Sequence, residues 1–187
     1  MEYSSVRLLQ TDVPGEKVVY SNSHMNRKGF TLMELLVVMA ILGVLIVAGI
    51  GNFMTSQKKS RDIKRKNDLR QISLALETYY NDLGSYPLSS GTHTPSGCGA
   101  SATSACTWGD VWKNTTTDTI YMITLPADPI STNSYYYVSD GSYFKLYARL
   151  ENTLDTGTGV AQSGYSGTSC GDATTCTYGI SSPNSVP

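Results

Sequence analysis

Residues 27–54 have the sequence RKGFTLMELLVVMAILGVLIVAGIGNFM, a basic pair followed by a long apolar run. Glu34 is the only charged side chain in the 25 residues from 30 to 54. A helix of that length extends about 37 Å, which is enough to cross the hydrocarbon core of a bilayer. Arg27 and Lys28 directly precede the apolar run, and such flanking positive charges keep the preceding end of a membrane helix in the cytoplasm. The sequence therefore predicts a membrane-spanning helix over residues 30–54, with the rest of the chain on the outer side.

The helical pattern continues beyond the apolar run, because residues 55–83 contain neither proline nor glycine. Apolar side chains recur there at intervals of three or four residues, at Leu69, Ile72, Leu76, Tyr79 and Leu83, which places them on one helical face. Gly84 is suited to end the helix. We predict one helix over residues 30–83. The segment 55–84 is expected to lie outside the membrane and to pack this apolar stripe on a globular head.

The head, residues 85–187, is predicted to hold a small antiparallel sheet. Strands are expected at 120–125 and 177–180, and a hairpin at 134–150 turns at Asp140-Gly141, a pair that favours a two-residue type I′ turn. One face of the second hairpin strand is apolar and should pack on the helix: Phe144, Leu146, Ala148 and Leu150. The other face carries Tyr143, Lys145, Tyr147 and Arg149. The expected fold class is α+β.

Four cysteines lie late in the chain, at Cys98, Cys106, Cys170 and Cys176, in segments rich in Gly, Ser and Thr. Clustered cysteines in polar loops favour disulfides in an oxidising compartment. A zinc site usually has two to four residues between paired ligands, whereas seven and five intervene here. Disulfides are therefore expected, ahead of free thiols and of a zinc site, with their connectivity left open. We predict no metal and no cofactor.

The stretch from Arg27 to Val38 resembles the type III signal sequence of prepilins and pseudopilins. It combines a short basic leader ending in Gly29, an aromatic Phe30, Glu34 as the fifth residue after Gly29, and an apolar helix. This resemblance implies a type IV pilin-like fold, in which a long helix packs on a small sheet with disulfide-bounded loops. It also implies a structural subunit rather than an enzyme.

The resemblance further implies that a prepilin peptidase cuts between Gly29 and Phe30 and methylates the new amine of Phe30. The implied partners are further copies of the chain in a filament, an inner-membrane assembly platform and its ATPase. The precursor would be a single-pass protein of the bacterial cytoplasmic membrane with its head outside. The filament would then reach the cell surface or span the periplasm.

Asp, Lys or Arg at the middle of a membrane helix costs roughly 2.5–3.5 kcal/mol, and we expect a comparable cost for Glu34 near the start of the span, so Glu34 needs a partner. Such residues are usually paired and functional. Cleavage would create a cationic amine at Phe30, and Glu34 of an incoming subunit could pair with the Phe30 amine of a neighbour and set the axial register. The alternative is that Glu34 lies at the level of the lipid headgroups.

Residues 57–70 form a basic collar with seven Lys or Arg, followed by an acidic body with three Lys or Arg and nine Asp or Glu. Four interpretations of the collar stay open. It could contact anionic headgroups, pair with acidic heads of neighbouring subunits, bind DNA, or form a solvated helix face.

Two features bear on the subtype. The stretch Leu125-Pro126-Ala127-Asp128-Pro129 is similar to one in the major pseudopilins of type II secretion. Those proteins bind calcium in a late acidic loop, but the region around Asp155 has too few carboxylates for the six to eight oxygens that calcium needs. The late cysteine pair resembles the disulfide-bounded loop of type IV pilins. A type IV pilus subunit is therefore predicted, with a type II secretion major pseudopilin or a DNA-uptake pseudopilus as the alternative.

The first residues of the chain and its two histidines bear on the leader and on competing classes of protein. Residues 25–29 would make a complete basic leader, so we expect translation to start at Met25 and residues 1–24 not to be translated. An ordinary signal peptide needs a small-x-small cleavage site, and Ala48-Gly49-Ile50 fails at its third position. The only histidines, His24 and His93, belong to no catalytic constellation.

Overall fold

The computed structural model describes residues 29–101, 103–172 and 174–187, with the backbone alone at residues 48–52. The leader predicted for residues 25–29 lies outside the described residues except for Gly29, and so do Arg27, Lys28 and the segment 1–24. The chain divides into two compact units, and the division falls between Leu45 and Ile46.

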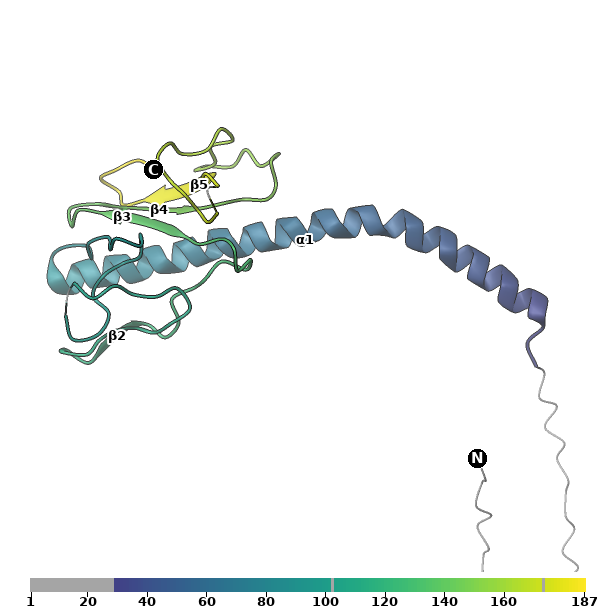
Figure 1. The fold of residues 1–187 in the computed structure, drawn as a ribbon, viewed down its shortest axis with the longest axis horizontal. Coiled ribbons are helices and arrows are strands. Elements are labelled where there is room, and N and C mark those ends of the chain that lie inside the picture. The colour runs from purple at the N-terminus through teal and green to yellow at the C-terminus, as the bar shows by residue number, and fades with distance from the viewer. Residues whose placement is uncertain (1–28, 102, 173) are drawn as a thin grey trace, which may run out of the picture. The chain divides into compact units, whose positions relative to one another are not determined.

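Helix α1 spans Leu32–Leu83, 52 residues, and is the only helix in the described part of the chain (Figure 1). It starts two residues later than predicted and ends where predicted. Gly84 has a φ of +74°, and its N–H donates to the carbonyl of Tyr80 at 2.8 Å, as expected of a residue that ends a helix. Within the described residues, no helix combines the length and apolar character needed to cross a membrane.

The larger sheet has three antiparallel strands in the order β3-β4-β5: β3 Tyr136–Ser139, β4 Phe144–Ala148 and β5 Tyr178–Ser181. The predicted hairpin and the last strand are therefore present. The predicted two-residue turn is wrong, because Ser139 pairs with Phe144 and leaves a four-residue loop. The Asp140 carboxylate accepts the N–H of Ser142 at 2.9 Å and stabilises this wider loop. A two-residue turn would have paired Ser139 with Ser142, so the observed register differs from the predicted one by two residues. A shift by an even number of residues leaves each side chain on its predicted face of the sheet.

The smaller sheet pairs β1 Trp112–Asn114 with β2 Thr119–Met122. The strand expected at 120–125 corresponds to β2, but β1 was missed. It has three residues and an irregular register next to Trp112, which leaves too little alternation to recognise. Figure 1 shows β2 on the opposite side of α1 from β3, β4 and β5.

The core forms around the predicted stripe of α1. Four of the five side chains in the stripe are buried: Leu69, Ile72, Leu76 and Tyr79. Leu83 is exposed, so the buried stripe ends at Tyr79. The apolar face of β4 and the aromatic residues of the smaller sheet complete this cluster: Phe144, Leu146, Ala148, Leu150, Trp112 and Tyr121. The predicted packing of β4 on the helix is confirmed. The outer face of β4 is covered too, because Tyr147 is buried with Cys170 and Cys176.

Candidate functional site

The predicted cleavage site lies outside α1. Gly29 and Phe30 are exposed and have no helical structure. The Thr31 hydroxyl accepts the N–H of Glu34 at 3.2 Å, so Thr31 caps the helix and satisfies one of its unpaired donors. The bond between Gly29 and Phe30 is therefore presented in accessible, non-helical chain.

Glu34 occupies the first turn of α1 and is exposed. A carboxylate in a first turn is stabilised by the partial positive charge of the helix N-terminus. Thr31 and Glu34 have the Thr-x-x-Glu spacing of a capping box. The role of Thr31 was not predicted, although the Thr-x-x-Glu spacing is visible in the sequence.

The first half of α1 exposes its apolar side chains on all sides. From Phe30 to Val47 every large apolar side chain is 45–88% exposed. The described chain thus provides no cover for this surface, and an apolar surface of such extent usually marks a membrane or protein contact.

The basic collar is largely turned towards the head, and Arg65 is its centre. The Arg65 side chain is completely buried. Its guanidinium donates two bonds to the Asp128 carboxylate, at 2.7 and 2.9 Å. It also donates to Asp62 and to Glu151, both at 2.8 Å. Burial opposes its charge, but the bonds to Asp128, Glu151 and Asp62 outweigh burial, so the pKa of Arg65 lies above its ordinary value.

Neighbouring cations extend this network. Arg61 holds Glu151 by two bonds at 2.7 and 2.6 Å, and Lys66 pairs with Asp155 at 2.6 Å. The hydrogen bond from Arg61, supported by Arg65, lowers the pKa of the Glu151 carboxyl to about 2. The helix is therefore joined to residues 128–155 of the head by paired charges.

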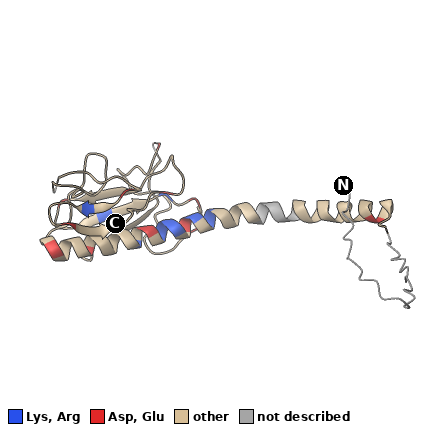
Figure 2. Cartoon of the chain, turned by 90° about the horizontal axis from the view of Figure 1, so that it is seen from below, with Lys and Arg blue, Asp and Glu red and all other residues tan. Residues whose placement is uncertain are grey.

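Figure 2 shows Lys and Arg concentrated along the middle of α1. Lys64 pairs with Asp68 at 3.1 Å, which leaves three collar cations without an ion-pair partner among the described residues: Lys58, Lys59 and Arg70. The structure shows ion pairs between the collar and carboxylates of the same chain, and none of the four interpretations of the collar included such pairs. The excess of Asp and Glu in the head was the feature of the sequence that could have predicted them.

The stretch around Asp128 gains a structural role from this network. The Asp128 carboxylate accepts both bonds from Arg65 and also the N–H of Ile130 at 2.8 Å. Residues 125–129, which resemble a stretch of major pseudopilins, therefore supply Asp128 as the buried counterion of Arg65. The Asp155 carboxylate accepts a hydrogen bond from the Lys66 ammonium. The described residues contain no group of three or more His, Cys, Asp or Glu side chains that could hold a metal ion.

Both cysteine pairs form disulfides, Cys98 with Cys106 and Cys170 with Cys176. The first closes a loop beside Trp112, and the second packs under Tyr147 of β4. The expectation of disulfide-bounded loops in the head is confirmed.

Comparison with known proteins places these features in a family. Residues 24–50 match the prokaryotic N-terminal methylation motif. The type II secretion system core protein G of Pectobacterium carotovorum subsp. carotovorum is 32% identical over 127 residues, 68% of this chain and 76% of the relative. The chain belongs to the type IV pilin and pseudopilin family. Core protein G of Pseudomonas aeruginosa is 32% identical over 124 residues, 65% of this chain and 82% of the relative.

The type IV major pilin protein PilA of Myxococcus xanthus is 34% identical over 59 residues, which is 32% of this chain and 27% of that pilin. No solved structure matches. Pilins and pseudopilins are membrane-anchored structural subunits that form filaments outside the cytoplasm. The chain is accordingly a structural subunit of a type IV pilus-like filament, and the pilus and type II secretion interpretations both fit these matches.

Proposed function

We propose that this chain is a precursor that residues 30–54 anchor in the bacterial cytoplasmic membrane, with the head on the outer side. This proposal rests on the exposed apolar surface from Phe30 to Val47. Lipid covers it in the precursor, and other copies of the chain cover it in the filament. The protein has a structural role and no catalytic one, and an inner-membrane assembly platform with its ATPase drives polymerisation.

Processing takes place between Gly29 and Phe30, where a prepilin peptidase cuts and then methylates the amine of Phe30. The exposed, non-helical chain at this bond supports the assignment. A Cβ atom added at Gly29 would meet no atom within 4 Å, so a substitution there tests recognition by the peptidase without disturbing the fold.

Mass spectrometry of the chain produced together with a prepilin peptidase tests this site. The expected product begins with N-methylated Phe30. Gly29→Leu should stay uncut, whereas the control Met33→Leu, at an exposed position in the first turn of α1, should be cut normally. A mature N-terminus at any other residue would refute the assignment.

Glu34 pairs with the Phe30 amine of a neighbouring subunit during assembly. Glu34→Gln is the sharpest test, because glutamine also suits the third position of a capping box, so the cap from Thr31 is kept while the charge is lost. This variant should be cut and methylated but should not assemble. Normal filament yield from processed Glu34→Gln would exclude the pairing.

The type II secretion pseudopilin is the more strongly supported subtype. The 127-residue match to core protein G is longer than the 52 residues of α1, so it extends into the head. The 59-residue match to PilA can be accommodated by the motif and the helix. Deleting the gene should abolish protein secretion. Loss of surface filaments or of transformation, with secretion intact, would favour a pilus or a DNA-uptake fibre.

A further inference from the structure

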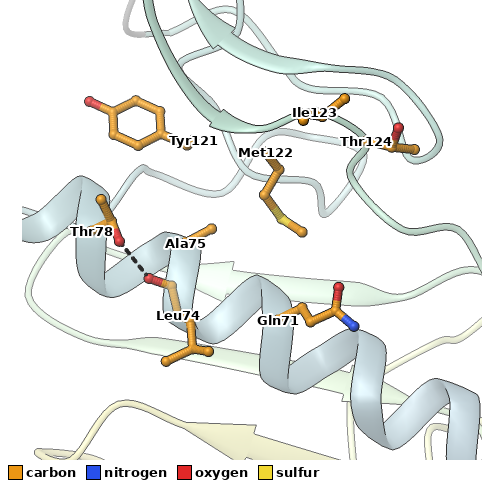
Figure 3. Close-up of a pocket in the computed structure, with 8 residues that line it drawn as sticks. All are labelled: Gln71, Leu74, Ala75, Thr78, Tyr121, Met122, Ile123 and Thr124. Carbon is orange, nitrogen blue, oxygen red and sulfur yellow. Dashed lines mark hydrogen bonds between the residues drawn. The ribbon is translucent and has the colours of Figure 1, made fainter.

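A groove runs along the flank of α1 that faces the smaller sheet (Figure 3). It has a volume of about 450 Å³ and lies between Leu74 and Ala75 of α1 and Met122 and Ile123 of the β2 end. Leu74 is 69% exposed and Ile123 is 83% exposed. Gln71, Thr78 and Thr124 add polar groups to the lining, and the side chains of Leu74 and Ile123 are open to an apolar partner.

Leu154, in the turn that follows β4, is the counterpart to this groove. It is 84% exposed, and Leu154 and Ile123 are the two most exposed large apolar side chains of the described head. The turn is held firmly on both sides. Asp62 accepts the N–H of Asn152 at 2.8 Å, and Lys66 binds Asp155 at 2.6 Å. Leu154 is therefore presented from a fixed turn, and the described part of the chain leaves most of its side chain uncovered.

The groove and the turn lie on different flanks of α1. The turn is held by Asp62 and Lys66, whereas Leu74, Ala75 and Thr78 line the groove. At about 100° of rotation per residue, these two sets of side chains point about 150° apart around the helix axis. The turn that carries Leu154 is therefore held on a different flank of α1 from the groove of its own chain.

An apolar projection on one flank and a groove with exposed apolar side chains on another suit a heterologous contact, which repeats from copy to copy without closing into a pair. We propose that Leu154 of one subunit docks into the groove beside Ile123 of an adjacent copy in the filament. This inference rests on the proposed function, because that function brings many copies together through α1. Copies joined in that way have a high effective concentration for a second contact.

The size of the contact also indicates a tethered copy. Burying one leucine side chain strengthens an association roughly ten- to hundredfold. One side chain in one groove covers far less than the roughly 1,200 Å² that stable independent complexes bury. The contact is thus too small to recruit a free partner, but it is sufficient to orient the heads of subunits that α1 already holds together.

Photo-cross-linking in filaments of the full chain tests the contact directly. A photoreactive amino acid at Leu154 should yield a covalent dimer whose junction lies at residues 71–78 or 121–124 of another copy. The same probe at Val186, which is 75% exposed, should not reach that groove. A cross-link from position 154 to lipid, to a different protein or to another face of the copy would overturn the proposal.

A charge exchange provides a second test. Leu154→Lys and Ile123→Glu should each lower filament yield about tenfold, because each places a charge in an apolar contact. The double variant should regain most of the yield through the new opposite charges, and the control Val186→Lys should assemble normally. Normal assembly of both single variants would overturn the docking proposal alone. A parent chain that is processed but forms no filament would instead overturn the proposed function.

Discussion

Replacing Arg65 with methionine removes the cation that neutralises a buried carboxylate. Asp128 is almost completely buried, and Arg65 donates two of its hydrogen bonds. After the substitution, the Asp128 carboxylate still accepts the N–H of Ile130, and Glu151 still accepts a hydrogen bond from Arg61. Among the described residues, no cation then remains in contact with Asp128.

Breaking a buried ion pair by removing one partner typically costs 3–5 kcal/mol. For a chain of this size, each kcal/mol corresponds to about 2–4 °C in Tm. We therefore expect Arg65→Met to lower the Tm of the head by about 6–20 °C. The control Lys59→Met lies in the same collar, but its side chain is exposed and has no ion-pair partner among the described residues. It should change stability by less than about 0.5 kcal/mol.

The assay is thermal unfolding of the full chain in detergent, followed by near-ultraviolet circular dichroism of Trp108 and Trp112, which both belong to the head. Adding Asp128→Leu to Arg65→Met should recover about 1–3 kcal/mol relative to the sum of the single effects, because the buried carboxylate is then gone. If Arg65→Met lost no more stability than Lys59→Met, the buried ion pair would not be what holds the head on α1.

Three further predictions concern the head. The Glu151 carboxyl has a folded-state pKa of about 2 against an ordinary value of 4.5. Its contribution to the free energy of unfolding is therefore complete above about pH 4.5 and disappears as the pH falls towards 2. Glu151→Gln should flatten the acid side of a curve of stability against pH. Replacing Cys170 and Cys176 with serine should lower the free energy of unfolding by about 2 kcal/mol in urea titrations, because the disulfide closes a short loop. Tyr135→Phe removes a 2.7 Å hydrogen bond to Asp68 and should cost about 1.5 kcal/mol by the same measurement.

Local patterns in the sequence predicted the elements that depend on neighbouring residues. The spacing of Leu69, Ile72, Leu76 and Tyr79 specified the buried face of α1, and Gly84 specified its end. The four-residue loop at Asp140 was not predicted, because Asp-Gly fits both the two-residue turn and the longer loop. The choice between them depends on the register of β3 against β4.

The ionic network could not be predicted from local patterns. Arg65 meets Asp128 across 63 positions and Glu151 across 86, so these contacts exist only after the head has packed on α1. Periodicity identified which residues of α1 are apolar, but it does not identify which polar positions become buried. Arg65 follows Asp62 by three residues and points to the same side of α1 as Asp62 and Leu69, which is the one local hint that it faces the head.

The inward pairing of the collar limits what it offers to outside partners. Four of its seven cations are neutralised within the described chain, and the other three are Lys58, Lys59 and Arg70. Each phosphate neutralised on duplex DNA contributes about −0.9 to the slope of log affinity against log salt. A DNA contact made by these three side chains would therefore have a slope no steeper than about −2.7. Lys58 and Lys59 instead lie directly after the apolar half of α1, where anionic headgroups or the acidic head of another subunit would meet them first.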